Sequence, residues 1–382
     1  MNTKMIKLAE ATIDEKDMDA LADWIKTYPR LTKGPLTLEF ESKWSEYIGV
    51  TDSIFVNSGS SANLIMLATL IEAGDLQRGD SVLVPALSWA TDLAPVIQLG
   101  LKPILCDANL EDFSCDLEDF ESILEEVQAA ILVPVLGFVP MMNTIVELCE
   151  KHDVILLEDC CESLGSEYKG QKLGTFGEMS SFSTYFGHHI STIEGGMVCT
   201  SNPKYSRILK SVRSHGWDRD WSESDQKAVR EEWGVSDFDA LYTFYHNGFN
   251  VRSTDLQAFL GLRQLEKLPS IVEARNKNYQ LYIKHLGCLG DDRDDILNSN
   301  FAFPIIRRNR DLIAKELQDN DIECRPLICG SMGQQPFFIK YNGGGVSCPR
   351  ADHLRRYGMY LPNHHLLTEQ DIIDVCNIVK KY

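Results

Sequence analysis

Residues able to move a proton or approach a ligand closely gather between Ser180 and Thr200, where the chain reads SSFSTYFGHHISTIEGGMVCT. Residues 182–186 and 197–200 favour strands, and the Gly-His-His triplet between them contains His188. An imidazole is a good base near neutral pH, and the pair Gly195-Gly196 permits a tight turn or a close ligand approach. A hairpin that carries two surface histidines is the alternative that this stretch alone leaves open.

Two other groups follow predicted strands. Asp159 comes directly after Glu158 and an apolar run, and an unpaired surface aspartate is the alternative to a buried functional one. Residues 58–61, Ser-Gly-Ser-Ser, separate a short predicted strand from a predicted helix. The free N–H groups of a helix N-terminus, with nearby hydroxyls, bind phosphate well, although the same motif is also an ordinary N-cap. Its spacing matches neither the P-loop nor the dinucleotide-binding fingerprint.

Short apolar runs alternate with helical patterns, which predicts an α/β fold with a mostly parallel sheet covered by helices. The predicted strands are 53–56, 81–84, 103–106, 130–135, 154–157 and 301–306, and the predicted helices are 14–27, 38–47, 62–71, 117–127, 144–151, 272–286 and 311–321. The length of 382 residues favours two domains: a large one over residues 1–250, with an N-terminal helical segment, and a smaller C-terminal α/β domain over residues 251–382. Ligands of such sheets bind at the carboxyl ends of the strands.

Composition excludes several classes of function. The formal charge of -19 argues against nucleic-acid binding, which needs a basic face. The charged start of the chain and the shortness of its apolar runs predict neither a signal peptide nor a membrane anchor, so we expect a cytoplasmic protein. The eleven cysteines are scattered and are expected to be reduced. No metal site is expected, because His364-His365 has no third ligand at a suitable spacing.

Taken together, the motifs around Ser58, Asp159 and Glu194 resemble the DegT/DnrJ/EryC1/StrS aminotransferase family of fold-type I pyridoxal-phosphate (PLP) enzymes. That family normally carries a lysine, bound covalently to the cofactor, six residues before the Glu of Glu-Gly-Gly. His188 occupies that position here, and the lysines at 169 and 172 lie in a predicted exposed turn. Within the family the chain most resembles the GDP-4-keto-6-deoxymannose 3-dehydratases, in which a histidine replaces the lysine.

A related group of CDP-sugar 3-dehydratases also has a histidine at this point but carries an iron–sulfur cluster. Those enzymes place a cysteine cluster in the region that follows His215 here. The present sequence reads GWDRDWSESDQKAVREEWGV in that region and contains no cysteine. The iron–sulfur group is therefore disfavoured, and the charged residues 218–232 are expected to form a mobile, solvated insertion.

The resemblance implies a role for individual residues. His188 and His215 are the implied catalytic residues, and Arg325 and Arg252 the implied substrate contacts. The implied cofactor-binding residues are Gly59, Ser60, Trp89, Asp159, Glu162, Ser183 and Asn250. In the family the asparagine reaches across a dimer interface to the neighbour's cofactor phosphate, so a homodimer with shared active sites is expected.

The implied reaction is a C3-dehydration of a nucleotide-linked 4-keto-6-deoxy sugar in lipopolysaccharide deoxysugar biosynthesis. PLP, or its amino form pyridoxamine phosphate, would be held without a covalent bond to lysine, and L-glutamate would supply the amino group. His188 would remove a proton from the imine-forming carbon of the cofactor, and the electrons released would expel the C3 hydroxyl group of the sugar. Two alternatives stay open: a glutamate-dependent aminotransferase on a keto or aldehydo sugar that uses His188 for both proton transfers, and a non-catalytic sugar-binding protein.

Overall fold

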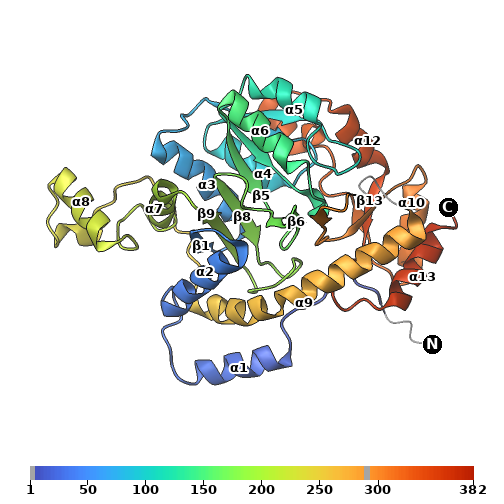
Figure 1. Cartoon of the computed structure of the whole chain (residues 1–382), viewed down its shortest axis with the longest axis horizontal. Helices are drawn as coiled ribbons and strands as arrows, with labels where there is room; N and C mark the ends of the chain where they lie inside the picture. Colours follow the sequence, from blue (N-terminus) through green and yellow to red (C-terminus); the bar gives the residue numbers. More distant parts are fainter. Residues whose placement is uncertain (1–4, 288–292) are drawn as a thin grey trace.

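The computed structural model describes residues 5–287 and 293–382, and its centre is a seven-stranded sheet (Figure 1). The strand order is β1-β9-β8-β5-β4-β2-β3. The strands are β1 (Asp52–Val56), β2 (Ser81–Pro85), β3 (Lys102–Cys106), β4 (Ala129–Leu132), β5 (Ile155–Asp159), β8 (Met179–Ser183) and β9 (Gly196–Thr200). Strand β9 runs antiparallel to both neighbours and the remaining pairs are parallel, which confirms the mostly parallel sheet.

Both faces of this sheet are buried. Successive residues of a strand point to opposite faces, so neighbouring residues of one strand belong to different hydrophobic clusters. Ile54 and Val56 of β1 belong to one hydrophobic cluster, whereas Phe55 between them belongs to the other. The first cluster is covered by α3 (Gly59–Ala73), α4 (Ala90–Gln98) and α7 (Pro203–Val212). The second is covered by α2 (Pro35–Ile48), α5 (Leu117–Leu124) and α6 (Met142–His152).

The long helix α9 (Asp255–Leu286) runs from the large sheet to the C-terminal part of the chain (Figure 1). That part contains a three-stranded sheet of order β11-β13-β12. Its elements are β11 (Phe303–Ile306), α10 (Arg310–Asp319), β12 (Arg325–Pro326), α11 (Pro336–Asn342), α12 (Pro349–Tyr357), β13 (Gly358–Leu361) and α13 (Glu369–Val379). Ile6 pairs with Ile322, so the beginning of the described chain lies against this part. The domain boundary at residue 250 stays a prediction.

The remaining elements are peripheral. They are α1 (Glu15–Ile25), α8 (Glu223–Trp233), the small sheet of β10 (Ile296–Leu297), β6 (Glu167–Tyr168) and β7 (Gln171–Lys172), and the 3-10 turns Val135–Gly137, Asp239–Tyr242 and Met332–Gln334. Lys169 lies in the turn between β6 and β7 and is exposed, as predicted, whereas Lys172 lies within β7 and is half-buried, so the prediction of an exposed turn is wrong for Lys172. No helix within residues 5–287 and 293–382 combines the length and the apolar character needed to cross a bilayer.

Several predicted boundaries are wrong. Strand β4 ends at Leu132 rather than residue 135, and the exposed Tyr185 lies in a loop beyond β8. Most of the predicted solvated insertion at 218–232 belongs to α8, which buries none of its residues. The first residue of the insertion, Asp218, is however fully buried, and its carboxylate pairs with Arg230 at 2.8 Å. Helix α9 begins seventeen residues before the predicted start at 272 and continues through Pro269. Prolines usually end helices. Pro95 lies inside α4 and Pro269 inside α9, which explains why the sequence did not predict α4 or the first half of α9.

Candidate active site

A cavity of about 290 Å³ lies where the parallel strands of the large sheet end. Its wall consists of segments that follow β1, β2, β4, β5 and β8, together with residues of the C-terminal part. The lining residues are Ser58, Gly59, Ser60, Ser88, Trp89, Thr91, Asp92, Val133, Val135, Asp159, Cys161, Glu162, Ser183, Tyr185, Gly187, His188, Glu194, Phe301, Ile328 and Tyr360. This position agrees with the rule for ligand sites of α/β sheets.

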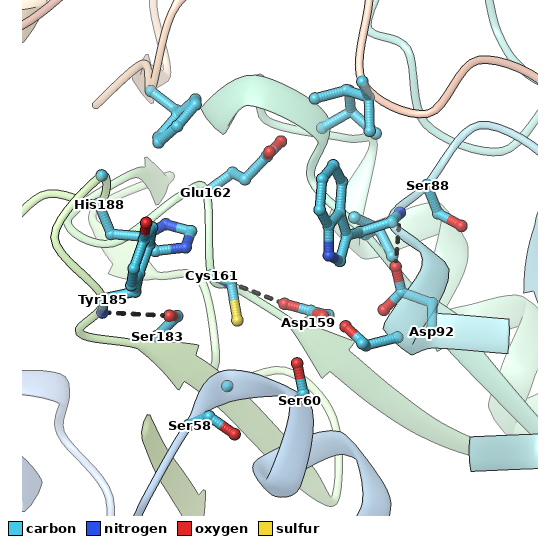
Figure 2. Close-up of a pocket in the computed structure, with 18 of the residues that line it drawn as sticks. Ser58, Ser60, Ser88, Asp92, Asp159, Cys161, Glu162, Ser183, Tyr185 and His188 are labelled. Atoms are coloured by element: carbon cyan, nitrogen blue, oxygen red, sulfur yellow. Dashed lines mark hydrogen bonds between the residues drawn. The ribbon is translucent and has the colours of Figure 1, made fainter. Parts of the chain in front are cut away.

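The N-terminus of α3 forms one end of this cavity (Figure 2). Ser58 is its N-cap residue, and the Ser58 hydroxyl accepts a hydrogen bond from the Ser61 N–H at 3.1 Å. A Cβ atom added to Gly59 would lie 2.8 Å from the Cβ of Ser183, so only glycine lets the helix start so close to β8. The result is a cradle of first-turn N–H groups and the hydroxyls of Ser60 and Ser183, which suits an anion such as phosphate.

Asp159, at the end of β5, is 5% exposed and held by two donors. The Asn63 Nδ2 group of α3 donates to its Oδ2 at 2.6 Å, and the Cys161 N–H donates to its Oδ1 at 2.9 Å. The Ser181 hydroxyl fixes the Asn63 amide by donating to its Oδ1 at 2.5 Å. The alternative of an unpaired surface aspartate is therefore wrong, and a buried carboxylate faces the cavity.

Trp89 lines the cavity and directly precedes α4, as its N-cap residue. Its side chain is 55% exposed, so it is not a core residue. The Trp89 N–H donates to the carboxyl group of Asp92 at 2.9 Å, which holds the backbone from which the indole projects. An exposed indole in the wall of a cavity can stack on a planar ligand.

His188 and His189 have different surroundings, and neither is a surface residue. His189 is fully buried, and its Nε2 lies 2.8 Å from the Ser299 carbonyl oxygen. His188 lines the cavity opposite Asp92, and its Nδ1 has no hydrogen-bond partner within the described part of the chain (Figure 2). Burial lowers the pKa of His188 to about 4, against the opposing effect of the Asp159 charge. The imidazole is therefore neutral at pH 7 and can accept a proton.

Glu162 is a second titratable group of the cavity wall. Its Oε2 accepts a hydrogen bond from the Leu136 N–H at 2.8 Å. Leu136 has a φ of 54°, a conformation uncommon for leucine, so this bond supports a strained turn beside the cavity. Burial raises the pKa of Glu162 to about 7, and the charge of Asp159 adds to the effect. Glu162 can therefore gain or lose a proton at physiological pH.

Four predicted site residues lie outside the cavity of a single chain. The segments around His215 and Asn250 run side by side, because Ser214 pairs with Asn250. Arg252 donates to the Ser214 hydroxyl at 2.9 Å, and Asn250 is exposed. Arg325 is also exposed, but it pairs in β12 with Tyr360, which lines the cavity. The roles of these four residues stay predictions.

Sequence reasoning missed several residues of the wall and its support, among them Asn63, Asp92, Phe301 and Tyr360. Asp92 accepts the N–H of Trp89 at the start of α4, but a tryptophan is not a typical N-cap residue, so no capping signature in the sequence marked α4 or Asp92. No local signal marks Phe301 or Tyr360, because the C-terminal part contributes them through the tertiary fold. His188 lies against Phe301, with 5.4 Å between the ring centroids.

Comparisons with known proteins agree with this geometry. The model of the DegT/DnrJ/EryC1/StrS aminotransferase family matches residues 11–380. The GDP-4-keto-6-deoxy-D-mannose 3-dehydratase of Yersinia pseudotuberculosis is 32% identical over 98% of each chain, and that of Escherichia coli O55:H7 is 31% identical over 94% of this chain and 95% of the relative. A crystal structure of GDP-4-keto-6-deoxymannose-3-dehydratase with a trapped PLP–glutamate geminal diamine superposes with a TM-score of 0.90 at 28% identity, covering 98% of this chain and 99% of the other.

Proposed function

Because the chain belongs to the DegT/DnrJ/EryC1/StrS aminotransferase family, we propose that it is a PLP-dependent dehydratase that removes the C3 hydroxyl of a nucleotide-linked 4-keto-6-deoxy sugar. This proposal rests on one observation: His188 is a neutral base in the cavity, and no lysine is among the described lining residues. The similar enzymes of Yersinia and Escherichia suggest a GDP-linked substrate. We place the reaction in the cytoplasm, in deoxysugar biosynthesis for lipopolysaccharide.

The polar groups and the indole of the cavity wall suit PLP. The cradle of Ser60, Gly59 and Ser183 suits the phosphate, and the Trp89 indole suits one face of the ring. The Asp159 carboxylate suits a protonated ring nitrogen. When bound, the cofactor supplies an electron sink for the charge that proton removal creates. The chain would hold it without a covalent bond, since an imidazole cannot form the link that a lysine amine forms.

In this proposal His188 performs the proton transfers. Its neutral ring would accept a proton from the cofactor carbon that bears the amino nitrogen, and would return it to the C3 hydroxyl group, which leaves as water. The low pKa that burial gives His188 favours this return, because the imidazolium form is unstable in the cavity. L-glutamate would restore the amino form of the cofactor after each turnover.

A glutamate-dependent sugar aminotransferase is the second candidate, because the family is named for aminotransferases. We would incubate the protein with PLP, ¹⁵N-labelled glutamate and GDP-4-keto-6-deoxymannose, and analyse the products by mass spectrometry. A dehydratase yields a sugar that has lost one oxygen and releases labelled ammonia. An aminotransferase yields a sugar that retains the label and all its other hydroxyl groups. Protein that binds no PLP would leave only the non-catalytic alternative.

The pH dependence of the rate tests the state of His188. Catalysis needs the neutral imidazole, so activity is lost as the pH falls through the His188 pKa, about 4 in this structure. The contribution of His188 to kcat should therefore be nearly equal at about pH 6 and about pH 7.5, whereas an ordinary histidine would be only about one quarter neutral at the lower pH. Glu162 titrates at about 7, so the comparison belongs in a Glu162→Gln background. A fourfold fall between these pH values would contradict the prediction.

We also propose a homodimer in which Asn250 completes the partner's phosphate cradle. Asn250 is exposed and does not line the cavity of its own chain, which is expected of a residue that serves a second copy. Co-expressing His188→Asn and Asn250→Ala chains should restore about a quarter of wild-type activity, because half of the randomly formed dimers are mixed and each has one intact site. No recovery in mixed dimers isolated with two different affinity tags would contradict shared sites.

A further inference from the structure

A second carboxyl group lies beneath the predicted cofactor site. Asp92, in the first turn of α4, is fully buried, and its Oδ2 accepts the Trp89 N–H at 2.9 Å. Its Oδ1 lies 3.2 Å from the Asn63 Nδ2 group, the same group that donates to Asp159 at 2.6 Å. One amide therefore links two carboxyl groups, and Figure 2 shows Asp92 and Asp159 on the same side of the cavity.

The hydrogen-bond donors around this pair are too few for two negative charges. The Asn63 amide has two hydrogens but three acceptors, because the Thr91 carbonyl oxygen also lies 3.2 Å from its nitrogen. Neither carboxyl group has a lysine or arginine partner in the described part of the chain, and the nearby Glu162 adds repulsion when it is ionised. Two carboxylates in one buried site cannot both stay ionised at low cost, so such pairs share a proton.

We infer that Asp92 is a positioning residue that holds the shared proton, which leaves the single negative charge of this pair on Asp159, where it faces the cavity. The inference rests on the proposed function, since the purpose of that charge is to hold the ring nitrogen of PLP. Asp159 receives the shorter Asn63 contact, as expected for the charged partner, and Asp92 is the more deeply buried of the two. Burial raises the pKa of Asp92 well above its usual range, and the charge of Asp159 adds to this rise.

Asp92 thereby connects two groups that would contact the cofactor. Through Asn63 and its own carboxyl group it orients Asp159, and through the Trp89 N–H it fixes the backbone beneath the indole. An asparagine at position 92 can imitate a protonated aspartate, because it offers an oxygen acceptor and an NH2 group that donates. An alanine can do neither. The two substitutions therefore separate a neutral acid from a carboxylate.

The first test needs no cofactor. The infrared difference spectrum between the wild-type apoprotein and the Asp92→Asn variant, at about pH 8, should contain the C=O band of a protonated carboxyl group in the wild type only.

The second test measures PLP affinity from the quenching of tryptophan fluorescence. Asp92→Ala should weaken PLP binding about tenfold or more, as expected when buried polar groups lose their partner, and Asp92→Asn should recover it to within about threefold.

Asp371→Ala is the matched control, because Asp371 caps α13 by accepting the Thr368 N–H at 2.9 Å, as Asp92 caps α4, but lies outside the cavity. It should leave PLP affinity unchanged. The inference is overturned if the protonated-carboxyl band is absent, if Asp92→Asn binds PLP as poorly as Asp92→Ala, or if Asp92→Ala binds it normally. Failure of the wild type itself to bind PLP would refute the proposed function, while the infrared band would still decide where the proton lies.

Discussion

Replacement of His188 by asparagine is expected to lower the rate of sugar dehydration by about 10²- to 10⁴-fold, the usual contribution of a positioned acid–base residue. Asparagine approximates the size of the imidazole but cannot accept a proton. The phosphate cradle and Asp159 are separate from His188, so the variant should still bind PLP. Glutamate should still convert the bound PLP to its amino form, but more slowly than in the wild type. Rapid-quench measurement of product after a single turnover reports the chemical step, and the absorption spectrum of bound PLP reports cofactor occupancy.

His353→Asn is the matched control for this substitution, since His353 is an exposed residue of α12 outside the cavity. It should keep the wild-type rate. If His188→Asn dehydrates the sugar at the wild-type rate, another residue is the base, and Glu162 becomes the first candidate because it titrates near pH 7 in the same cavity. Loss of PLP binding together with activity would instead assign His188 to cofactor retention.

The sequence predicted the central sheet well because its strands are short apolar runs between polar turns. Strands β1, β2 and β3 begin and end within about one residue of the predicted positions. The errors have physical causes. Val133 and Val135 continue the apolar run of β4 but line the cavity instead of extending the strand, and Tyr185 belongs to the exposed loop that leads to His188. Apolar character alone does not distinguish a sheet core from a cavity wall.

The candidate site was predictable where a functional residue directly follows a strand or begins a helix. Asp159, Ser183 and Gly59 occupy such positions, and the structure brings them to one cavity. Asn63 was not predictable, because it lies within a helix whose apolar composition hides a single buried amide. Phe301 and Tyr360 enter the cavity from elements more than a hundred residues beyond His188. Contacts that arise only from tertiary packing leave no local pattern in a single sequence.

Replacement of Asp159 by asparagine is expected to have the second large effect, a loss of about 10²-fold or more in the rate, because the variant loses the one charge that would stabilise a protonated ring nitrogen. PLP should also bind more weakly, since a neutral amide replaces the carboxylate that accepts from Asn63 and Cys161. Titration of the bound cofactor's absorption should show a lower pKa for its ring nitrogen than in the wild type.

Asp153→Asn is the matched control for Asp159, because Asp153 precedes the opposite end of β5, is exposed, and has the left-handed conformation that asparagine tolerates. It should leave rate and PLP affinity unchanged. The charge of Asp159 raises the pKa of Asp92, so Asp159→Asn should also shift ionisation of Asp92, seen in the infrared spectrum, to lower pH. An unaltered Asp92 titration would mean that the two carboxyl groups are not coupled. A fully active Asp159→Asn enzyme would mean that the ring nitrogen needs no anion in this cavity.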